Sequence, residues 1–117
     1  MILTHGYLSR TYKQYNIYYM NLLFGEDFDT LKFRAKNLYD AKDLRYSNRR
    51  NKKYVVTLKN GKNIHFGDSR HEDFLLHQDW NRRLRYRKRA SMIKNKDGKL
   101  TYKDPEYANY WSYHLLW

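Results

Sequence analysis

The Asn-Gly dipeptide at residues 60–61 constrains the fold of this chain more than any other feature of its sequence. It separates a β-rich run at residues 54–58 from the alternating apolar residues Ile64 and Phe66. Asn-Gly between two such runs is the strongest short-range signal for a hairpin, because a type I′ turn requires positive φ at both central residues. The sequence therefore predicts an antiparallel hairpin over residues 53–67.

A two-stranded hairpin is marginal in water and needs further elements to cover one face. Residues 44–47 are a candidate third strand. Tyr and Leu recur at three- and four-residue steps over residues 9–24, which indicates a helix ended by Gly25. A second helix is predicted to begin in the acidic cluster at 26–30 and to end near Asp43. Its apolar face consists of Leu31, Ala35, Leu38 and Ala41.

A third helix is predicted over residues 79–93, with Asp79 as its N-cap. Helical spacing gives this segment one apolar side, made of Tyr86, Ala90 and Ile93 with Trp80 and Leu84 beside them. The other side is basic and carries Arg82, Arg85, Lys88 and Arg89.

The segment Asp104-Pro105-Glu106 predicts a helix start, because proline is favoured at the first helical position. Residues 107–117 then form a short aromatic helix or an extended plug, and their apolar end predicts a C-terminus packed into the core. A second interpretation is a stacking platform or a docking surface for another protein. The aromatic side chains concerned are Tyr107, Tyr110, Trp111, Tyr113 and Trp117.

These elements predict an α+β fold, a small antiparallel hairpin or three-stranded sheet packed against two or three helices. The basic α+β domain is assigned to residues 44–117, and residues 1–43 are assigned to an N-terminal helical extension. The sheet is expected to pack against the 79–93 helix and the C-terminal segment.

The chain has no cysteine, which excludes disulfides and thiolate metal sites. It also has no run of 18 apolar residues, so no membrane partner is expected. We find no glycine-rich phosphate loop and no nucleophile elbow, and therefore expect no cofactor and no catalysis.

Positive charge is arranged in blocks along the chain. Lys and Arg number 24 against 12 Asp and Glu, a net charge of +12 over 117 residues. Residues 45–67 and 82–96 hold basic side chains and no acidic ones, and the connector at 68–81 is acidic. Such charge favours a phosphate-rich partner. An AT-rich gene would also raise the content of Lys, Asn and Tyr, but uniform codon bias does not by itself create blocks.

Eight basic residues are predicted to contact the phosphates of nucleic acid, with DNA favoured over RNA. They are Arg49, Arg50, Lys52, Lys53, Arg82, Arg85, Lys88 and Arg89. Guanidinium groups at three- and four-residue steps share one helix face and match phosphate oxygens. Basic residues beside Tyr46 and Tyr54 suit a groove that tracks the backbone. The alternatives are a solvated face, pairing with Asp68, Glu72 and Asp73 in the same molecule, and protection of an edge strand.

A metal-dependent nuclease is a further alternative. Its ligands would be His65, Asp68, His77 and Asp79, with His71 and Asp73 nearby. Imidazole and carboxylate groups together bind divalent metals, and a hairpin followed by a helix is typical of the ββα-metal nucleases. The competing interpretation is structural, with Asp79 as a helix cap and Asp68 supporting the turn at Gly67.

A series of short motifs resembles a small family of uncharacterised proteins found mainly in large DNA viruses of eukaryotes, with relatives in some phages. The resemblance covers about residues 44–117. The motifs are Ser47-x-Arg49-x-x-Lys52-Lys53-Tyr54, Asn60-Gly61-Lys62, His65-Phe66-Gly67-Asp68, His77-x-Asp79, Arg82-Arg83-x-x-Tyr86-x-x-Arg89, Trp111-Ser112 and Leu115-Leu116-Trp117.

This resemblance implies a viral protein, located in the host cytoplasm at the viral factory or in the virion. It implies no activity. With the charge blocks, it leads to an expectation of sequence-tolerant nucleic-acid binding in genome packaging or as a replication accessory. The alternative is a virion structural or assembly protein that binds acidic viral proteins.

Overall fold

A three-stranded antiparallel sheet, in the order β1-β2-β3, organises the fold. The structure, a computed structural model, describes residues 27–117, and the helix predicted at 9–24 lies outside the described residues. The strands and the helices before and between them are α2 (Phe28–Leu38), β1 (Asp43–Tyr46), β2 (Lys52–Thr57), β3 (Asn63–Asp68), α3 (Phe74–His77) and α4 (Trp80–Ala90). A 3₁₀ turn (Thr101–Lys103) and α5 (Ala108–Trp111) follow, and α5 continues into a π-helical turn (Ser112–Leu116). The predicted α+β class is confirmed.

One face of the sheet carries the core. Cross-strand neighbours Leu44, Val56 and Ile64 share this face, and Leu44 and Val56 are fully buried. α2 packs on the β1 side and the C-terminal segment on the β3 side, and both contribute to one hydrophobic cluster. Leu31 of α2 belongs to that cluster. The described part of the predicted N-terminal extension is therefore built into the core of the domain.

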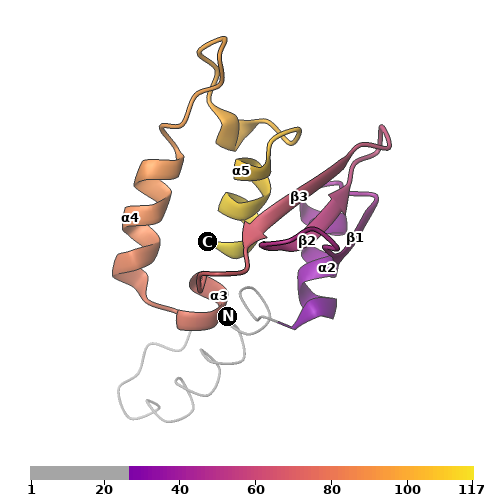
Figure 1. Ribbon diagram of the computed structural model, residues 1–117, viewed down its shortest axis with the longest axis horizontal. Coiled ribbons are helices and arrows are strands. Elements are labelled where there is room, and N and C mark those ends of the chain that lie inside the picture. The colour runs from indigo at the N-terminus through magenta and orange to yellow at the C-terminus, as the bar shows by residue number, and fades with distance from the viewer. Residues whose placement is uncertain (1–26) are drawn as a thin grey trace, which may run out of the picture.

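The position of α4 corrects a prediction. α4 does not cover the sheet, because the C-terminal segment lies between them (Figure 1). The N-cap is as predicted, since the Asp79 carboxylate accepts from the backbone N–H groups of Asn81 and Arg82 at 3.0 and 3.2 Å. The predicted apolar side is largely wrong: Ala90 is buried, whereas Leu84 is 63 % exposed. Trp80 and Ile93 are exposed as well.

The hairpin is confirmed, but its turn differs from the predicted one. Gly61 N–H donates to the Leu58 carbonyl at 2.9 Å, and Leu58 N–H donates to the Lys62 carbonyl at 2.8 Å. Gly61 has φ +88°, whereas Asn60 is not among the described residues with positive φ. The loop therefore has three residues and ends in a left-handed glycine, a common hairpin alternative to the two-residue type I′ turn.

α2 ends five residues before the predicted end at Asp43. Asp27 caps its start by accepting from Asp29 N–H at 3.3 Å. Beyond Leu38 the chain turns through Asp40, whose φ is +59°, and Ala41 is buried outside the helix. The helical spacing of Ala41 was therefore misleading, because a turn brings this residue to the core.

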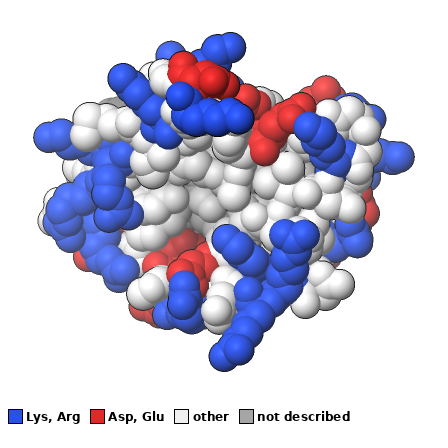
Figure 2. Space-filling model, turned by 45° about the horizontal axis from the view of Figure 1, so that its top comes forward, with Lys and Arg blue, Asp and Glu red and all other residues white. Residues whose placement is uncertain are grey.

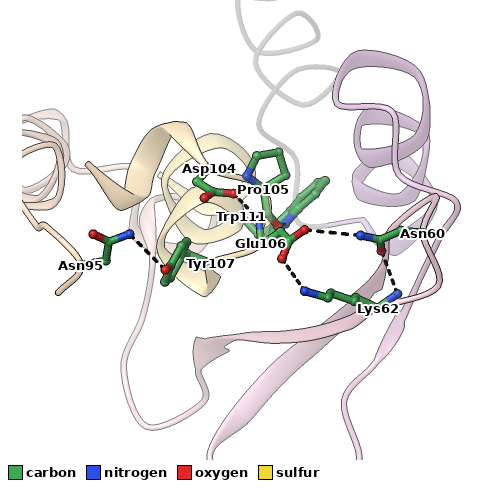
Figure 3. Close-up of polar contacts among 8 residues, drawn as sticks. All are labelled: Asn60, Lys62, Asn95, Asp104, Pro105, Glu106, Tyr107 and Trp111. Atoms are coloured by element: carbon green, nitrogen blue, oxygen red, sulfur yellow. Dashed lines mark hydrogen bonds and ion pairs between the residues drawn. The ribbon is translucent and has the colours of Figure 1, made fainter. Parts of the chain in front are cut away.

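The helix predicted to start at 104–106 begins at Ala108 instead. The residues before Ala108 form a turn that is bound by side chains of the β2–β3 hairpin and of α5 (Figure 3). Glu106 binds Lys62 of the hairpin at 2.5 Å, and the indole N–H of Trp111 donates to the Pro105 carbonyl at 2.7 Å. Pro105 thus contributes an acceptor to the turn rather than the first residue of a helix.

The C-terminus is packed into the core, as predicted. Trp111, Leu115 and Leu116 are at most 1 % exposed. Among residues 27–117, no helix has both the length and the apolar character needed to span a membrane.

Three arginines bind the carbonyl groups at the end of the chain, and we call them the carbonyl-binding arginines. Arg34 donates to the carbonyls of Leu115 and His114 at 3.0 and 2.9 Å. Two arginines of α4 do the same: Arg83 donates to Trp117 at 2.5 Å and Arg87 to Tyr113 at 3.1 Å. The last carbonyls of a helix lack intrahelical donors, and cations are favourable beside them. No sequence pattern predicted this role for the three arginines.

Candidate nucleic-acid interface

A cleft of about 650 Å³ lies between α4, the C-terminal segment and the loop that follows β3. Its cationic lining comes from both basic blocks, with Lys52 and Lys53 from β2 and Arg82, Arg85 and Arg89 from α4. Figure 2 shows this face hollowed, with Lys and Arg side chains on either side of the hollow and acidic side chains at its margin. Five of the eight predicted contact residues thus meet at one site.

The α4 wall carries three exposed guanidinium groups, which we call the cleft arginines: Arg82, Arg85 and Arg89. Over residues 27–117, none of the three has a carboxylate within ion-pair distance. The Asp79 cap orients this wall, and hydrogen bonds from backbone N–H groups lower the pKa of Asp79, which keeps the cap ionised.

Lys53 differs from the other cleft cations because its charge is already neutralised. Its ammonium group lies 2.6 Å from the Asp73 carboxylate, and the two side chains are 15 % and 7 % exposed. Asp73 also caps α3 by accepting from Leu75 N–H at 3.1 Å. This ion pair joins β2 to the start of α3, so Lys53 has a structural partner inside the protein.

The acidic residues of the cleft leave the cleft arginines unpaired. Asp68 accepts two hydrogen bonds from the Arg70 side chain at 3.0 Å each and one from the Arg70 backbone N–H at 2.9 Å. These bonds lower the pKa of Asp68 well below its usual range. Asp73 is bound to Lys53. Glu72 is exposed and has no ion-pair partner within the described segment. The predicted alternative, pairing of these carboxylates with the α4 arginines, is not found there.

The remaining charge in the cleft is positive. Four cations without an ion pair, namely Lys52 and the three cleft arginines, oppose one free carboxylate, that of Glu72. The surplus is three positive charges. Like charges held this close repel one another, so an anion in the cleft is favoured.

Aromatic rings form part of the cleft wall. Tyr86 and Trp117 stack with their centroids 4.1 Å apart and their planes at 10°, and both line the cleft. Burial raises the pKa of the Tyr86 phenol, so the ring stays neutral. The side chain of Arg89 lies 5.6 Å from the centre of the Tyr86 ring. Of the C-terminal aromatics predicted either as core or as a stacking surface, Trp117 lines the cleft and Trp111 is fully buried.

Gly67 allows the C-terminal segment to approach the sheet. Its φ is +79°, and a Cβ atom there would lie 2.9 Å from the Leu116 side chain and 3.2 Å from Lys53 Cβ. Only glycine tolerates both the backbone conformation and this contact. The His65-Phe66-Gly67-Asp68 motif therefore has a packing role at the edge of the cleft.

The other three predicted contact residues, Arg49, Arg50 and Lys88, are exposed but do not line the cleft. Arg49 and Arg50 lie in the connection between β1 and β2. Lys88 lies on α4 one turn from both Leu84 and Arg85, but its side chain is not part of the cleft lining. The basic surface is thus wider than the cleft.

The four candidate metal ligands do not converge. His65 bonds to the Ser47 hydroxyl at 2.7 Å, Asp68 is bound by Arg70, and Asp79 caps α4. The Nδ1 atom of His77 accepts from Asp79 N–H at 2.8 Å. Within residues 27–117, no group of three or more His, Asp or Glu side chains is arranged to hold a metal ion. The convergence that the nuclease alternative requires is therefore missing from that part of the chain.

Residues 42–90 match the model of a family of unknown function (DUF5754). The matched segment is 49 of the 117 residues and runs from the start of β1 to the end of α4. It contains all of the cationic residues of the cleft and lacks the C-terminal segment that completes it. No curated protein and no solved structure matched the chain.

Proposed function

We propose that this protein binds nucleic acid through the phosphate backbone, with the cleft between α4 and the C-terminal segment as its site. One observation carries the proposal. Basic residues about 30 positions apart, Lys52 and the cleft arginines, line the same cleft and have no ion-pair partner in the described structure. Guanidinium groups bind phosphate oxygens in a bidentate manner, and contact with phosphates carries no sequence information. Binding is accordingly sequence-tolerant.

The charge of the cleft predicts the salt dependence. Three surplus positive charges would displace about three counterions, so log K should fall with log salt concentration with a slope of about −2 to −3. The exposed cations outside the cleft, such as Arg49 and Arg50, would steepen this slope if a longer nucleic acid reached them.

The test is fluorescence anisotropy with labelled single-stranded and duplex DNA over a salt series. The triple variant Arg82→Ala/Arg85→Ala/Arg89→Ala should bind at least about tenfold more weakly and with a flatter slope. The matched control is Lys94→Ala/Lys96→Ala/Lys99→Ala, which removes the same charge from exposed positions outside the cleft. Equal losses in both variants would refute a specific role for the cleft, and absence of salt-sensitive binding to any form would refute the function.

In the viral setting that the motif resemblance implies, such binding would serve genome packaging or replication. DNA is the expected partner, in the viral factory of the host cytoplasm or in the virion. Detection of the protein in purified virions together with cross-linking to the genome would test this setting.

A second candidate function is binding of an acidic viral protein during assembly. The observation that favours it is an exposed apolar pair on α4. Trp80 and Leu84 lie one turn apart and are 50 % and 63 % exposed, and Lys88 lies one turn beyond Leu84. Apolar side chains beside cations suit an acidic amphipathic helix. Leu84→Glu should then abolish binding of a Glu-rich amphipathic peptide and leave DNA binding intact. An unchanged affinity for that peptide would count against this candidate.

A further inference from the structure

The shape of the cleft restricts the form of nucleic acid that can enter it. Its cations come from two elements, with Lys52 on β2 and Arg82, Arg85 and Arg89 on α4. The C-terminal segment lies between these two elements (Figure 1). The cleft is open to solvent, and its volume of about 650 Å³ falls in the range of small-ligand sites. A B-form duplex could reach the cations of the cleft with its phosphates, but its base faces lie inside the stack and could not contact the aromatic wall.

The lining of the cleft suits an unpaired nucleotide. Tyr86 and Trp117 both line the cleft and are both half-buried, so the part of this stacked pair that is not covered supplies aromatic surface next to the guanidinium group of Arg89. In a duplex, base faces are covered by their neighbours in the stack. In a single strand they are available to aromatic side chains, and this contact is tolerant of sequence because every base has a π face.

We infer that the cleft binds a single-stranded segment of nucleic acid, with its phosphates at the cleft arginines and Lys52 and a base against the Tyr86–Trp117 pair. This inference rests on the proposed function and names the form of nucleic acid that the site takes. The surplus of three positive charges corresponds to a segment of about three phosphates, and the slope of log K against log salt for a single strand is then about −2.

Glu72 has a role in this arrangement. It is the one free carboxylate among the described lining residues and belongs to the loop after β3. The negative charge of Glu72 repels phosphates from the loop after β3, so the strand follows the α4 wall rather than this loop. Replacing Glu72 with Gln should therefore tighten binding to single strands.

The experiment compares three labelled ligands of one sequence on the full chain: a single strand of 12 nucleotides, the blunt 12-base-pair duplex, and that duplex with a single-stranded overhang. We expect the single strand and the overhang to bind about tenfold or more tightly than the blunt duplex. A mononucleotide and inorganic phosphate serve as competitors and should displace the strand only at much higher concentration. If inorganic phosphate displaces the labelled strand as effectively as the same strand without label does, the inference that the cleft requires a nucleic-acid strand is overturned.

Variants locate the base contact. Tyr86→Leu keeps apolar volume and removes the ring, and it should weaken single-strand binding roughly tenfold while changing duplex binding little. Tyr107→Leu is the control, because Tyr107 is an exposed tyrosine outside the cleft. An effect of Tyr107→Leu equal to that of Tyr86→Leu would contradict a base site at Tyr86.

The outcomes separate the two proposals. Equal, salt-sensitive affinity for the single strand and the blunt duplex would overturn the inference and leave the proposed function standing. No salt-sensitive binding to any of the three ligands would overturn both. The comparison of ligands needs no variant, so it remains decisive if Tyr86→Leu does not fold.

Discussion

The two arginine faces of α4 differ in what lies opposite them. On one face, Arg83 and Arg87 donate to the carbonyl groups of Trp117 and Tyr113. On the adjacent face, Arg82 and Arg85 are exposed and line an open cleft. The residue type and the helix are the same, and positions 82 and 83 are neighbours in sequence. An arginine of α4 therefore stabilises the fold where the fold supplies hydrogen-bond acceptors, and is available to a ligand where the fold does not.

Burial gives the physical basis of this difference. A buried cation loses its hydration and must be compensated by hydrogen bonds. Arg34, which is 6 % exposed, gains two carbonyl acceptors in return, and burial lowers the pKa of its guanidinium group and of that of Arg83. The cleft arginines keep their hydration, so they can exchange it for phosphate at little cost.

The largest expected effect is that of Arg34→Ala. It leaves two carbonyl groups of the C-terminal segment without their buried donors, and should lower the free energy of unfolding by about 3 kcal/mol. Urea denaturation followed by tryptophan fluorescence measures the change. Arg82→Ala, measured alongside, should leave the denaturation midpoint unchanged. Equal effects of the two variants would erase the distinction between the two classes of arginine.

Lys53→Ala is expected to have the next largest effect on stability, because it leaves the nearly buried Asp73 carboxylate unpaired. The loss should be about 2 kcal/mol, smaller than for a fully buried pair because Lys53 is partly exposed. This variant sharpens the comparison, since Lys53 lines the cleft but is expected to behave like the carbonyl-binding arginines. A variant as stable as the wild type but much weaker in DNA binding would move Lys53 to the other class.

Arg87→Ala should cost about 1.5 kcal/mol, because Arg87 donates one hydrogen bond and its guanidinium carbon lies 3.8 Å from the centre of the Tyr113 ring. Arg87→Lys is the informative companion, since it keeps the charge but lacks the planar fork. Chemical denaturation of both variants, with DNA binding as a second measurement, checks the assignment. Weaker DNA binding without loss of stability would show that Arg87 belongs with the cleft arginines.

The smallest effect should come from pH. Burial lowers the pKa of His114, and the nearby charge of Arg87 lowers it further. The unfolded chain therefore takes up the proton first, so this stabilisation is fully present above the unfolded pKa of about 6.5 and is lost as pH falls below it. Thermal melts between pH 7.5 and 5.5 should show a decrease that is smaller in His114→Gln. The same decrease in both proteins would rule out His114 as its source.

Local sequence signals predicted the parts of the fold that depend on neighbouring residues. The hairpin, the third strand and the Asp79 cap all follow from propensities and hydrogen bonds within a few positions. The end of α2 and the start of α5 were misplaced, because Ala41 and Pro105 lie in turns outside the helices: Ala41 N–H donates back to the Ala35 carbonyl, and the Pro105 carbonyl accepts from the Trp111 indole. The apolar side of α4 was also misassigned, since helical spacing fixes which residues share a side but not which side is covered.

Part of the candidate site was also predictable from local sequence. Five of the eight predicted contact residues line the cleft, and the three on α4 share one helix face because they are spaced three and four residues apart. The neutralisation of Lys53 by Asp73 could not be foreseen, since these residues are 20 positions apart. The place of Trp117 in the cleft wall could not be foreseen either, because it follows from stacking on Tyr86, a residue far away in the sequence.

By itself, the sequence determined the α+β class, the strands, the helix cap at Asp79 and the two blocks of positive charge, because these features arise from local hydrogen bonding and composition. The tertiary structure alone decided which arginines bind carbonyl groups and which face the cleft. The physical reason is that a charge takes its role from the groups packed opposite it, and on α4 those groups belong to the C-terminal segment, more than 20 residues further along the chain.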